Sequence, residues 1–268
     1  MPFLYNTVTL ELHYSTFDPI AAAFDRHREL PQGVAEAVRT AIGSITRLSP
    51  ATRILDLGAG TGRFGKVFVA ANDLYVGVDS SQEMLRAFLK HNADACLILA
   101  DGQQLPFRDG TFGIVMLMQV LSGLRDWRGL LSEARRVLHP EGAIVVGHTV
   151  SPPQGINTQL KEHLAIILQE MKAPWHEPKK SRGQALAWLE TFASRHERIR
   201  VAEWKAHLTP REFLDRRRTG ARFAALPAAV QEEALQELTA WAQSTFGSLD
   251  TIFTEEHSFE LDIFHHSK

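Results

Sequence analysis

Short apolar segments alternate with segments of helical spacing between residues 53 and 146, and this alternation constrains the fold more than any other feature of the chain. The apolar segments are 53–57, 74–78, 95–99, 112–118 and 143–146. Each is a continuous apolar run, which is typical of parallel strands buried on both faces. Helical segments at 63–71, 81–91 and 127–138 separate them. The pattern predicts an α/β domain with a doubly wound, mostly parallel sheet covered by helices.

The second half of the chain is expected to extend this sheet. Helical spacing at 156–171 and 184–196 flanks an expected loop at 173–183. Two further strands, 198–206 and 257–264, bring the predicted sheet to seven strands. A helical stretch at 210–247 lies between them, and we interpret it as an insertion covering one face of the sheet.

Composition and charge narrow the class of protein. The formal net charge is −2, so no global field attracts nucleic acid or an anionic membrane. The single cysteine, Cys96, excludes an internal disulfide and lies in an apolar stretch, where a packed thiol is expected. We see no signal peptide, no apolar run near the roughly 20 residues of a membrane span, and no cluster with metal-ligand spacing. We therefore expect a cytoplasmic protein without a metal site.

The turn after the first strand reads RILDLGAGTGRFG at residues 53–65. Glycine tolerates positive φ and lets a ligand approach the backbone, and a helix starting near Arg63 would direct its N–H groups at that ligand. Asp56 ends the strand, and its carboxylate would repel a pyrophosphate but suits a cationic ligand without phosphate. S-adenosyl-L-methionine (SAM), which carries a sulfonium and an ammonium group, is such a ligand.

A dinucleotide site is the main alternative for these residues. Gly60, Gly62 and Gly65 satisfy G-x-G-x-x-G, and Asp79 follows about 20 residues later, where a ribose-binding acid belongs. That fingerprint, however, places its first glycine directly after the strand. Here that residue is Gly58, and counting from it puts Arg63 in the place of the third glycine. A glycine turn without any ligand is a further alternative.

The segment DLGAGTG, residues 56–62, resembles motif I of the class I SAM-dependent methyltransferases. Three more segments resemble later motifs of that family in order and spacing: YVGVDSSQEML at 75–85, ADGQQLPFRDGTFGIVMLMQVL at 100–121 and LLSEARRVLHPEGAIVVG at 130–147. The pattern is most similar to the ubiquinone/menaquinone-type small-molecule enzymes. The resemblance covers residues 20–149 and implies a Rossmann-like fold that binds SAM and releases S-adenosyl-L-homocysteine.

The resemblance also implies which residues hold the methionine and ribose parts of SAM. The loop residues Gly58, Ala59, Gly60 and Gly62 are expected beneath the methionine part. Asp56 is expected to face the ammonium group, directly or through water. Asp79 is expected to accept both ribose hydroxyls, because a carboxylate can take two donors. Capping of the helix 81–91 by Asp79 is the alternative, although Ser80 or Ser81 would do that better.

The adenine and the methyl group are expected near the ends of the later strands. Met84 is spaced to pack against the adenine face, with a plain core position as the alternative. Asp101 is expected to accept from the adenine amino group, with the amide of Gly102 or Gln103 near the ring, unless Asp101 only stabilises its own turn. Ser80 is expected beside the ribose. Gln119 ends the fourth strand and should face the methyl-donor end.

Three parts of the chain are expected to build the enzyme. Residues 1–50 form a helical segment that closes over the cofactor, through Phe24, Arg26 or Arg28 in the segment FDRHR, with a solvated charge patch on a helix as the alternative for these residues. Residues 51–150 form the SAM-binding core, and residues 151–268 supply the rest of the sheet, with a helical lid at about 208–247. His148, after the fifth strand, is the candidate base for an acceptor that must lose a proton, and a structural histidine is the alternative.

The acceptor itself is only coarsely predicted. No Asn-Pro-Pro-Tyr-like segment follows the fourth strand, where the chain reads QVLSG, so a nucleic-acid amino methyltransferase is not favoured. We expect methyl transfer to an O, N or C atom of a small molecule. A SAM-binding protein without turnover and an RNA or protein methyltransferase are the alternatives. The cations at 179–182 and 216–218 form either a basic rim for an anionic acceptor or a solvated surface.

Overall fold

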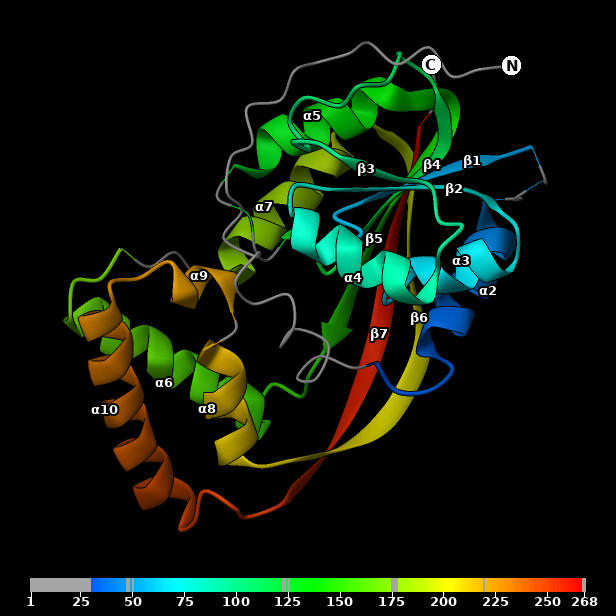
Figure 1. Cartoon of the computed structure of the whole chain (residues 1–268). Helices are drawn as coiled ribbons and strands as arrows, with labels where there is room; N and C mark the ends of the chain where they lie inside the picture. Colours follow the sequence, from blue (N-terminus) through cyan, green and yellow to red (C-terminus); the bar gives the residue numbers. More distant parts are fainter. Residues whose placement is uncertain are drawn as a thin grey trace.

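One twisted sheet of seven strands organises the protein (Figure 1). The computed structural model describes residues 30–46, 49, 51–121, 124, 126–174, 178–218 and 220–266. The strands are β1 (Arg53–Leu57), β2 (Leu74–Asp79), β3 (Leu97–Leu99), β4 (Phe112–Met118), β5 (Leu138–Val150), β6 (Ala193–Leu208) and β7 (Phe253–His266). Their order is β3-β2-β1-β4-β5-β7-β6; β1 to β5 pair in parallel, and β7 is antiparallel to both β5 and β6. The prediction of a mostly parallel seven-stranded sheet is confirmed.

The continuous apolar strands are buried on both faces, as their composition predicts. In β4, Val115 and Leu117 join the hydrophobic cluster beneath α5 (Trp127–Val137) and α7 (Pro178–Glu190). Ile114 and Met116, which alternate with them, join the cluster on the opposite face. Three helices cover that second face: α2 (Val34–Ile45), α3 (Gly65–Ala70) and α4 (Gln82–His91). Because neighbouring side chains of a strand point to opposite faces, a mostly apolar run is needed to fill both layers.

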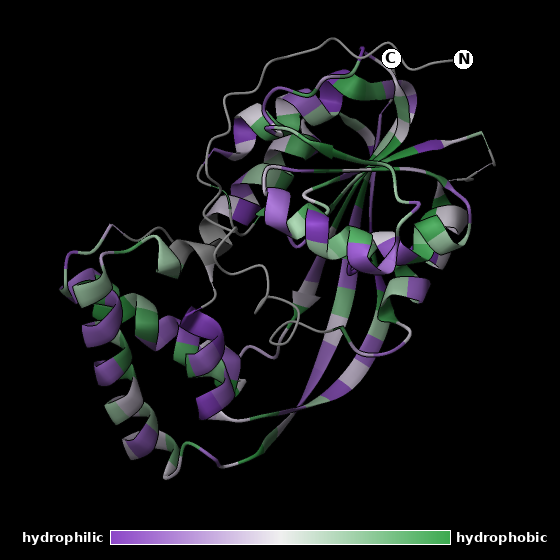
Figure 2. Ribbon diagram, viewed as in Figure 1, coloured by the Kyte–Doolittle hydropathy of each residue, from purple (hydrophilic) through white to green (hydrophobic). Residues whose placement is uncertain are grey.

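The later elements differ from the sequence prediction in their bounds. β5 begins directly after α5 and extends to Val150, well beyond the predicted strand at 143–146. The loop expected at 173–183 is partly helical, because α7 already begins at Pro178 and ends at Glu190. Proline suits the first turn of a helix, where its missing N–H would have no partner. β6 and β7 are likewise longer than predicted and form a ribbon with many hydrophilic residues (Figure 2).

Helices at the far end of the β6–β7 ribbon form a hydrophobic core of their own (Figure 1). They are α6 (Ile156–Glu170), α8 (Pro210–Arg218), α9 (Ala221–Ala224) and α10 (Ala228–Phe246). The stretch 210–247 therefore packs on α6. The prediction that it covers one face of the sheet is wrong. Both sheet faces already carry helices, and the apolar stripe of α6, with Leu160 and Leu164, is buried against α8 and α10. No helix in the described ranges is both long and apolar enough to cross a membrane.

Candidate active site

The loop after β1 is fastened to the end of β2. Gly58, Gly60 and Gly62 have φ of +85°, +56° and +86°, which glycine adopts without steric cost. The amides of Gly58 and Ala59 donate to the carbonyl of Val78 at 2.8 and 2.9 Å. A Cβ atom at Gly60 would meet nothing within 4 Å, so the backbone there is open to a ligand.

Asp79 stands beside this loop with both carboxylate oxygens oriented by the backbone. Oδ2 accepts from the amide of Gly60 at 2.8 Å, and Oδ1 accepts from the amide of Ser81 at 2.9 Å. The N-cap of α4 is Ser81, whose hydroxyl accepts from the Met84 amide at 3.2 Å, so Asp79 is not the capping residue. Ser80 is exposed next to it. The loop after β1 and the acid after β2 thus form one unit at the carboxyl edge of the sheet.

Asp56 lies beneath this unit and is almost fully buried, with 2% of its surface exposed. Its Oδ2 accepts from the hydroxyl of Tyr75 at 2.8 Å, whereas its Oδ1 has no hydrogen-bond partner among the described residues. Burial raises the pKa of Asp56 to about 7, against the opposing effect of the Tyr75 hydrogen bond. A buried oxygen without a donor costs free energy, so this carboxylate is suited to a cationic group that a ligand brings.

Tyr75 is a site residue that the sequence prediction missed. It lies in β2 with 5% of its surface exposed, and its hydroxyl is directed at Asp56. A buried tyrosine hydroxyl usually has a hydrogen-bond partner, so a tyrosine within an otherwise aliphatic strand was an available signal. The position of that partner depends on the pairing of β1 with β2, which places Ile54 opposite Tyr75.

The helix after the glycine loop differs from expectation. α3 begins at Gly65 and not at Arg63, and it has only six residues. Its first N–H groups therefore come two residues later in the chain than predicted. The side chain of Arg63 instead donates from Nη1 to Oε1 of Gln119 at 3.3 Å. This contact bridges the loop after β1 to the end of β4.

The residues expected around adenine lie on α4 and in the loop after β3. Met84 is buried, with 2% exposure, and Gly102 packs so closely that a Cβ atom would lie 2.9 Å from the side chain of Leu130. Asp101 is exposed, and its Oδ1 accepts from the amide of Gln103 at 2.9 Å, as in an Asx turn. The turn role foreseen for Asp101 is therefore present, and a role toward adenine stays a prediction.

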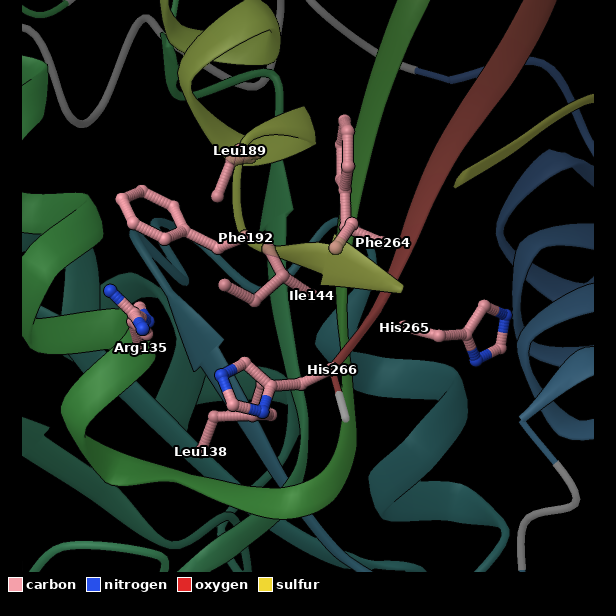
Figure 3. A pocket seen from close by; sticks show the side chains of 9 residues that line it. Arg135, Leu138, Ile144, Leu189, Phe192, Phe264, His265 and His266 are labelled. Carbon is pink, nitrogen blue, oxygen red and sulfur yellow. The ribbon is translucent and has the colours of Figure 1, made fainter. Parts of the chain in front are cut away.

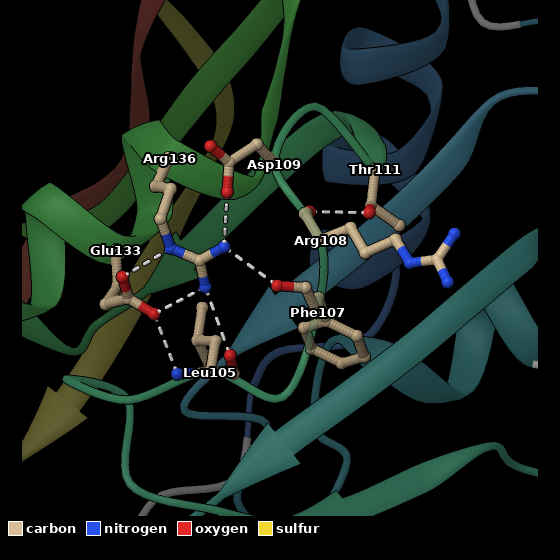
Figure 4. Close-up of polar contacts among 7 residues, drawn as sticks. All are labelled: Leu105, Phe107, Arg108, Asp109, Thr111, Glu133 and Arg136. Atoms are coloured by element: carbon tan, nitrogen blue, oxygen red, sulfur yellow. Dashed lines mark hydrogen bonds and ion pairs between the residues drawn. The ribbon is translucent and has the colours of Figure 1, made fainter. Parts of the chain in front are cut away.

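A partly exposed arginine network holds this loop in place (Figure 4). The guanidinium of Arg136, on α5, donates to both carboxylate oxygens of Glu133 and to the carbonyls of Leu105 and Phe107. It also forms an ion pair with Asp109 at 2.8 Å. Glu133 in turn accepts from the amide of Leu105 at 2.8 Å. These contacts raise the pKa of Arg136 and lower that of Glu133.

We expect Arg136→Met to lower the free energy of unfolding by about 1–2 kcal/mol, because Glu133 and two carbonyls lose their donor in a network that solvent partly screens. SAM affinity should also fall, since the loop that carries Asp101 is loosened. Urea unfolding and calorimetry measure the two effects. The control is Arg86→Met, which removes an exposed pair with Glu83 and should cost less than about 0.5 kcal/mol. Equal losses in both variants would contradict the assigned role of the network.

Gln119 connects three strand ends at the carboxyl edge. Its φ is +62°, which is uncommon for a residue other than glycine. Its amide donates to the Gly147 carbonyl at 2.8 Å, and its side-chain Nε2 donates to Thr149 at 2.8 Å. With the contact to Arg63, this side chain links the loop after β1 to β4 and β5. The structure therefore places Gln119 at the predicted edge.

His148 follows Gly147 in β5, but its side chain points to the opposite face from that of Thr149, because side chains alternate along a strand. It is 8% exposed, and its Nδ1 lies 3.8 Å from Oδ2 of Asp262 in β7. Burial is the largest cause that lowers its pKa, followed by the charge of Arg182. His148 thus follows the residue paired with the end of β4, and its side chain lies on the sheet face opposite to that of Thr149, the partner of Gln119. Phe24, Arg26 and Arg28 lie outside the described residues.

A small apolar hollow elsewhere in the molecule is not part of this edge (Figure 3). Leu138, Ile144, Phe192 and Phe264 line it together with Arg135. Its volume is about 20 Å³, which is room for little more than a water molecule. Leu138 is the first residue of β5, so the hollow lies at the amino end of that strand. Ligands of doubly wound sheets bind at the other end.

Comparison with known proteins identifies the family. A family profile described as a methyltransferase domain matches residues 55–146. A demethylmenaquinone methyltransferase of Mycolicibacterium gilvum is 32% identical over 159 residues, which are 59% of this chain and 69% of that protein. The chain belongs to the class I SAM-dependent methyltransferases. This confirms the family resemblance of the four motifs and sets the dinucleotide interpretation aside.

Other relatives of this methyltransferase are matched over a shorter part of their length. A demethylmenaquinone methyltransferase of Streptomyces griseus is 34% identical over 133 residues, which cover 49% of this chain and 58% of that relative. The one from Corynebacterium urealyticum is 37% identical over 122 residues, 45% of this chain and 52% of its own. This chain thus spans little more than half the length of these relatives.

Solved structures share the fold. The YcgJ protein of Bacillus subtilis superposes with a TM-score of 0.56 at 19% identity, covering 87% of this chain and 99% of that one. A phosphoethanolamine N-methyltransferase of Haemonchus contortus, solved with phosphomonomethylethanolamine and S-adenosylhomocysteine, has a TM-score of 0.52 at 15% identity and covers 94% of this chain and 58% of its own. The Rossmann-like methyltransferase fold is therefore confirmed.

Proposed function

We propose that this protein transfers the methyl group of SAM to a small-molecule acceptor. The observation that carries the proposal is the unit formed by Gly60 and Asp79 above the buried carboxylate of Asp56. A rigid acid at the rim suits the ribose hydroxyls, and a buried oxygen without a donor suits an ammonium group. Both features fit a phosphate-free, cationic nucleoside better than a dinucleotide.

Each predicted site residue then has a role. The loop Gly58, Ala59, Gly60 and Gly62 would support the methionine part, and Asp56 would face the ammonium group. Asp79 and Ser80 would border the ribose. Met84, Asp101 and Gly102 would surround the adenine, and Gln119 would face the methyl-donor end. When bound, SAM supplies an electrophilic methyl group on a sulfonium, so the residues of the chain mainly hold and align the reactants.

A small acceptor is favoured over nucleic acid or protein by the charge of the chain and by its relatives. The formal net charge of −2 provides no global field that would attract a polyanion. The relatives named as demethylmenaquinone methyltransferases support a small organic acceptor, and a cytoplasmic location accords with such an activity. The division into a segment at 1–50 that closes over SAM, a core at 51–150 and a part at 151–268 with a lid at about 208–247 belongs to the same proposal.

Calorimetry tests the proposal first. We expect SAM and S-adenosyl-L-homocysteine to bind, and NAD not to bind. Asp79→Ala should weaken SAM binding about 100-fold, because two charge-assisted hydrogen bonds of about 1.5 kcal/mol each are lost. The control is Asp94→Ala, an exposed acid in the segment between α4 and β3. Near wild-type affinity of the Asp79 variant would refute the ribose contact.

A screen for S-adenosyl-L-homocysteine release then tests turnover, beginning with reduced demethylated quinones because of the relatives' names. Release with a small acceptor supports the enzyme. SAM binding without release from any acceptor favours a non-catalytic SAM-binding protein. Release only with RNA or protein favours the remaining alternative.

A further inference from the structure

A group of charged side chains lies on the α7-facing side of the sheet, at the level where β4 ends. Gly147 pairs with Met118, the last residue of β4, and His148 follows it opposite Glu260 of β7. Asp262 is two residues further along β7, so it lies on the same face as Glu260 and His148. Arg182 of α7 and Arg198 of β6 complete the group. This group is on the carboxyl side of β5 but separate from the residues assigned to SAM.

His148 and Asp262 face each other with incomplete hydrogen bonding. Asp262 is fully buried, and its Oδ1 accepts from Arg198 at 2.7 Å and contacts Nε2 of His196 at 3.0 Å. Its Oδ2 and the Nδ1 of His148 are both buried and lack hydrogen-bond partners among the residues described. The 3.8 Å between these two atoms is too long for a hydrogen bond. A small movement of the imidazole would satisfy both atoms at once, with Nδ1–H donating to Oδ2.

Arg182 is the cation beside this pair. Within the described part of the chain, no hydrogen bond or ion pair is found for its side chain, although it is partly buried. Asp262 and Glu260 attract the guanidinium only at longer range, while Arg198 repels it. The carboxylates nearby are already occupied, since Asp262 is held by Arg198 and Glu260 contacts Arg200 at 3.4 Å. The fork of N–H donors on Arg182 is thus left to bind an oxyanion.

We infer that Arg182, His148 and Asp262 form the acceptor site, which takes a small molecule bearing an oxyanion, a carboxylate or a phosphate, together with an acidic hydroxyl that receives the methyl group. This inference rests on the proposed methyl transfer. Arg182 binds the oxyanion, and His148 faces the hydroxyl. Asp262 is a positioning residue that holds the imidazole through Nδ1.

In this arrangement, methyl transfer to the acceptor hydroxyl proceeds with a defined place for each proton and electron pair. The hydroxyl proton of the acceptor passes to Nε2 of His148, and the acceptor oxygen forms a bond to the methyl carbon. The carbon–sulfur bond breaks, and its electron pair stays on sulfur. Asp262 stabilises the resulting imidazolium, which then returns its proton to solvent. The lowered pKa of His148 keeps the imidazole neutral, and able to accept this proton, at neutral pH.

Binding of simple probes to the protein loaded with S-adenosyl-L-homocysteine tests the oxyanion contact. We expect 4-hydroxybenzoate or 4-hydroxyphenyl phosphate to bind at least tenfold more tightly than the neutral 4-hydroxybenzamide. Arg182→Gln should abolish this preference. The control Arg195→Gln, which changes an exposed arginine of β6, should preserve it. No preference for either anion, or an unchanged preference in Arg182→Gln, would overturn the inference.

Nuclear magnetic resonance of the histidine rings provides a second readout that a merely structural role would not move. The His148 signals, assigned by their loss in His148→Gln, should shift when 4-hydroxybenzoate is added. In Asp262→Asn the imidazole tautomer should change, because the asparagine amide no longer accepts from Nδ1–H in the same way. If the His148 signals do not shift when 4-hydroxybenzoate is added, the proposed site is refuted. SAM calorimetry on the wild-type protein separates the acceptor-site inference from the proposed function. If SAM does not bind, the proposed function is contradicted. If SAM binds but the anion probes show no preference and no shift of His148, only this inference is contradicted.

Discussion

In the absence of SAM, the free energy of unfolding of Asp56→Asn, measured relative to wild type, is expected to rise by about 3 kcal/mol between pH 4 and pH 7. Asp56 has a pKa raised from 3.8 to about 7 by burial. In this pH window the folded state therefore binds more protons than the unfolded state, so the wild type loses stability as the pH rises. Asparagine does not titrate, and the variant lacks this loss. The difference between two urea-unfolding series measured across the pH range isolates the contribution of Asp56.

The same ionisation should control SAM affinity. If the charged form of Asp56 receives the ammonium group, wild-type affinity should be about tenfold lower at pH 6 than at pH 8, because only the ionised fraction is competent. Asp56→Asn should bind more weakly and show no such pH dependence. Asp94→Asn, an exposed acid, should leave both the stability difference and the affinity profile unchanged. A pH-independent wild-type affinity would contradict the ammonium contact, even if the stability prediction holds.

Asp56 also illustrates why a functional site tolerates an unfavourable group. A carboxylate with 2% exposure and one oxygen without a partner destabilises the free protein at neutral pH. Replacement by an apolar or neutral residue would stabilise the fold and remove the charge that a cationic ligand needs. Tyr75 moderates the cost through its hydrogen bond, which lowers the pKa of Asp56. Burial and this hydrogen bond thus act in opposite directions and leave the pKa of Asp56 at about 7.

The sequence predicted the elements that local pattern determines. β1 and β4 have the predicted bounds, because each is an apolar run closed by a glycine turn or a polar residue. The lengths of β6 and β7 were underestimated. The residues at their ends are strand because they pair with the neighbouring strand, and they have no apolar pattern that would predict it. The position of 210–247 against α6 depends on a cluster shared by four helices, which no local spacing reveals.

The candidate site shows the same division. Gly60 and Asp79 were predictable, because both follow strands whose carboxyl ends meet at one edge. The partners of Asp56 and His148 were not, because Tyr75 and Asp262 reach them only through sheet pairing between segments distant in the sequence. Asp262 did carry a signal: it is a charged residue between Leu261 and Ile263, both fully buried. A buried acid between apolar neighbours requires a partner, and here it has three cationic or titratable neighbours.

Two alanine substitutions in the glycine loop should separate folding from binding. Gly62→Ala is expected to lower the free energy of unfolding by about 3 kcal/mol, through overpacking and the strain of positive φ. A Cβ atom at Gly62 would lie 2.4 Å from the ring of Phe88, which is fully buried, and φ there is +86°. The ring cannot retreat without disturbing its edge contact with Tyr75. Urea unfolding measures this loss.

Gly60→Ala is the matched variant, because its φ of +56° imposes strain while its Cβ atom meets nothing within 4 Å. It should cost only about 1 kcal/mol of unfolding free energy. Its SAM affinity should nevertheless fall at least tenfold, since the methyl group projects into the space where the ligand is expected. If Gly60→Ala binds SAM like wild type, the ligand does not lie over this glycine. If both variants lose the same stability, the contact between Gly62 and Phe88 does not decide the fold of the loop. The two glycines then differ in role although they share a motif: Gly62 is required by packing, and Gly60 by the ligand.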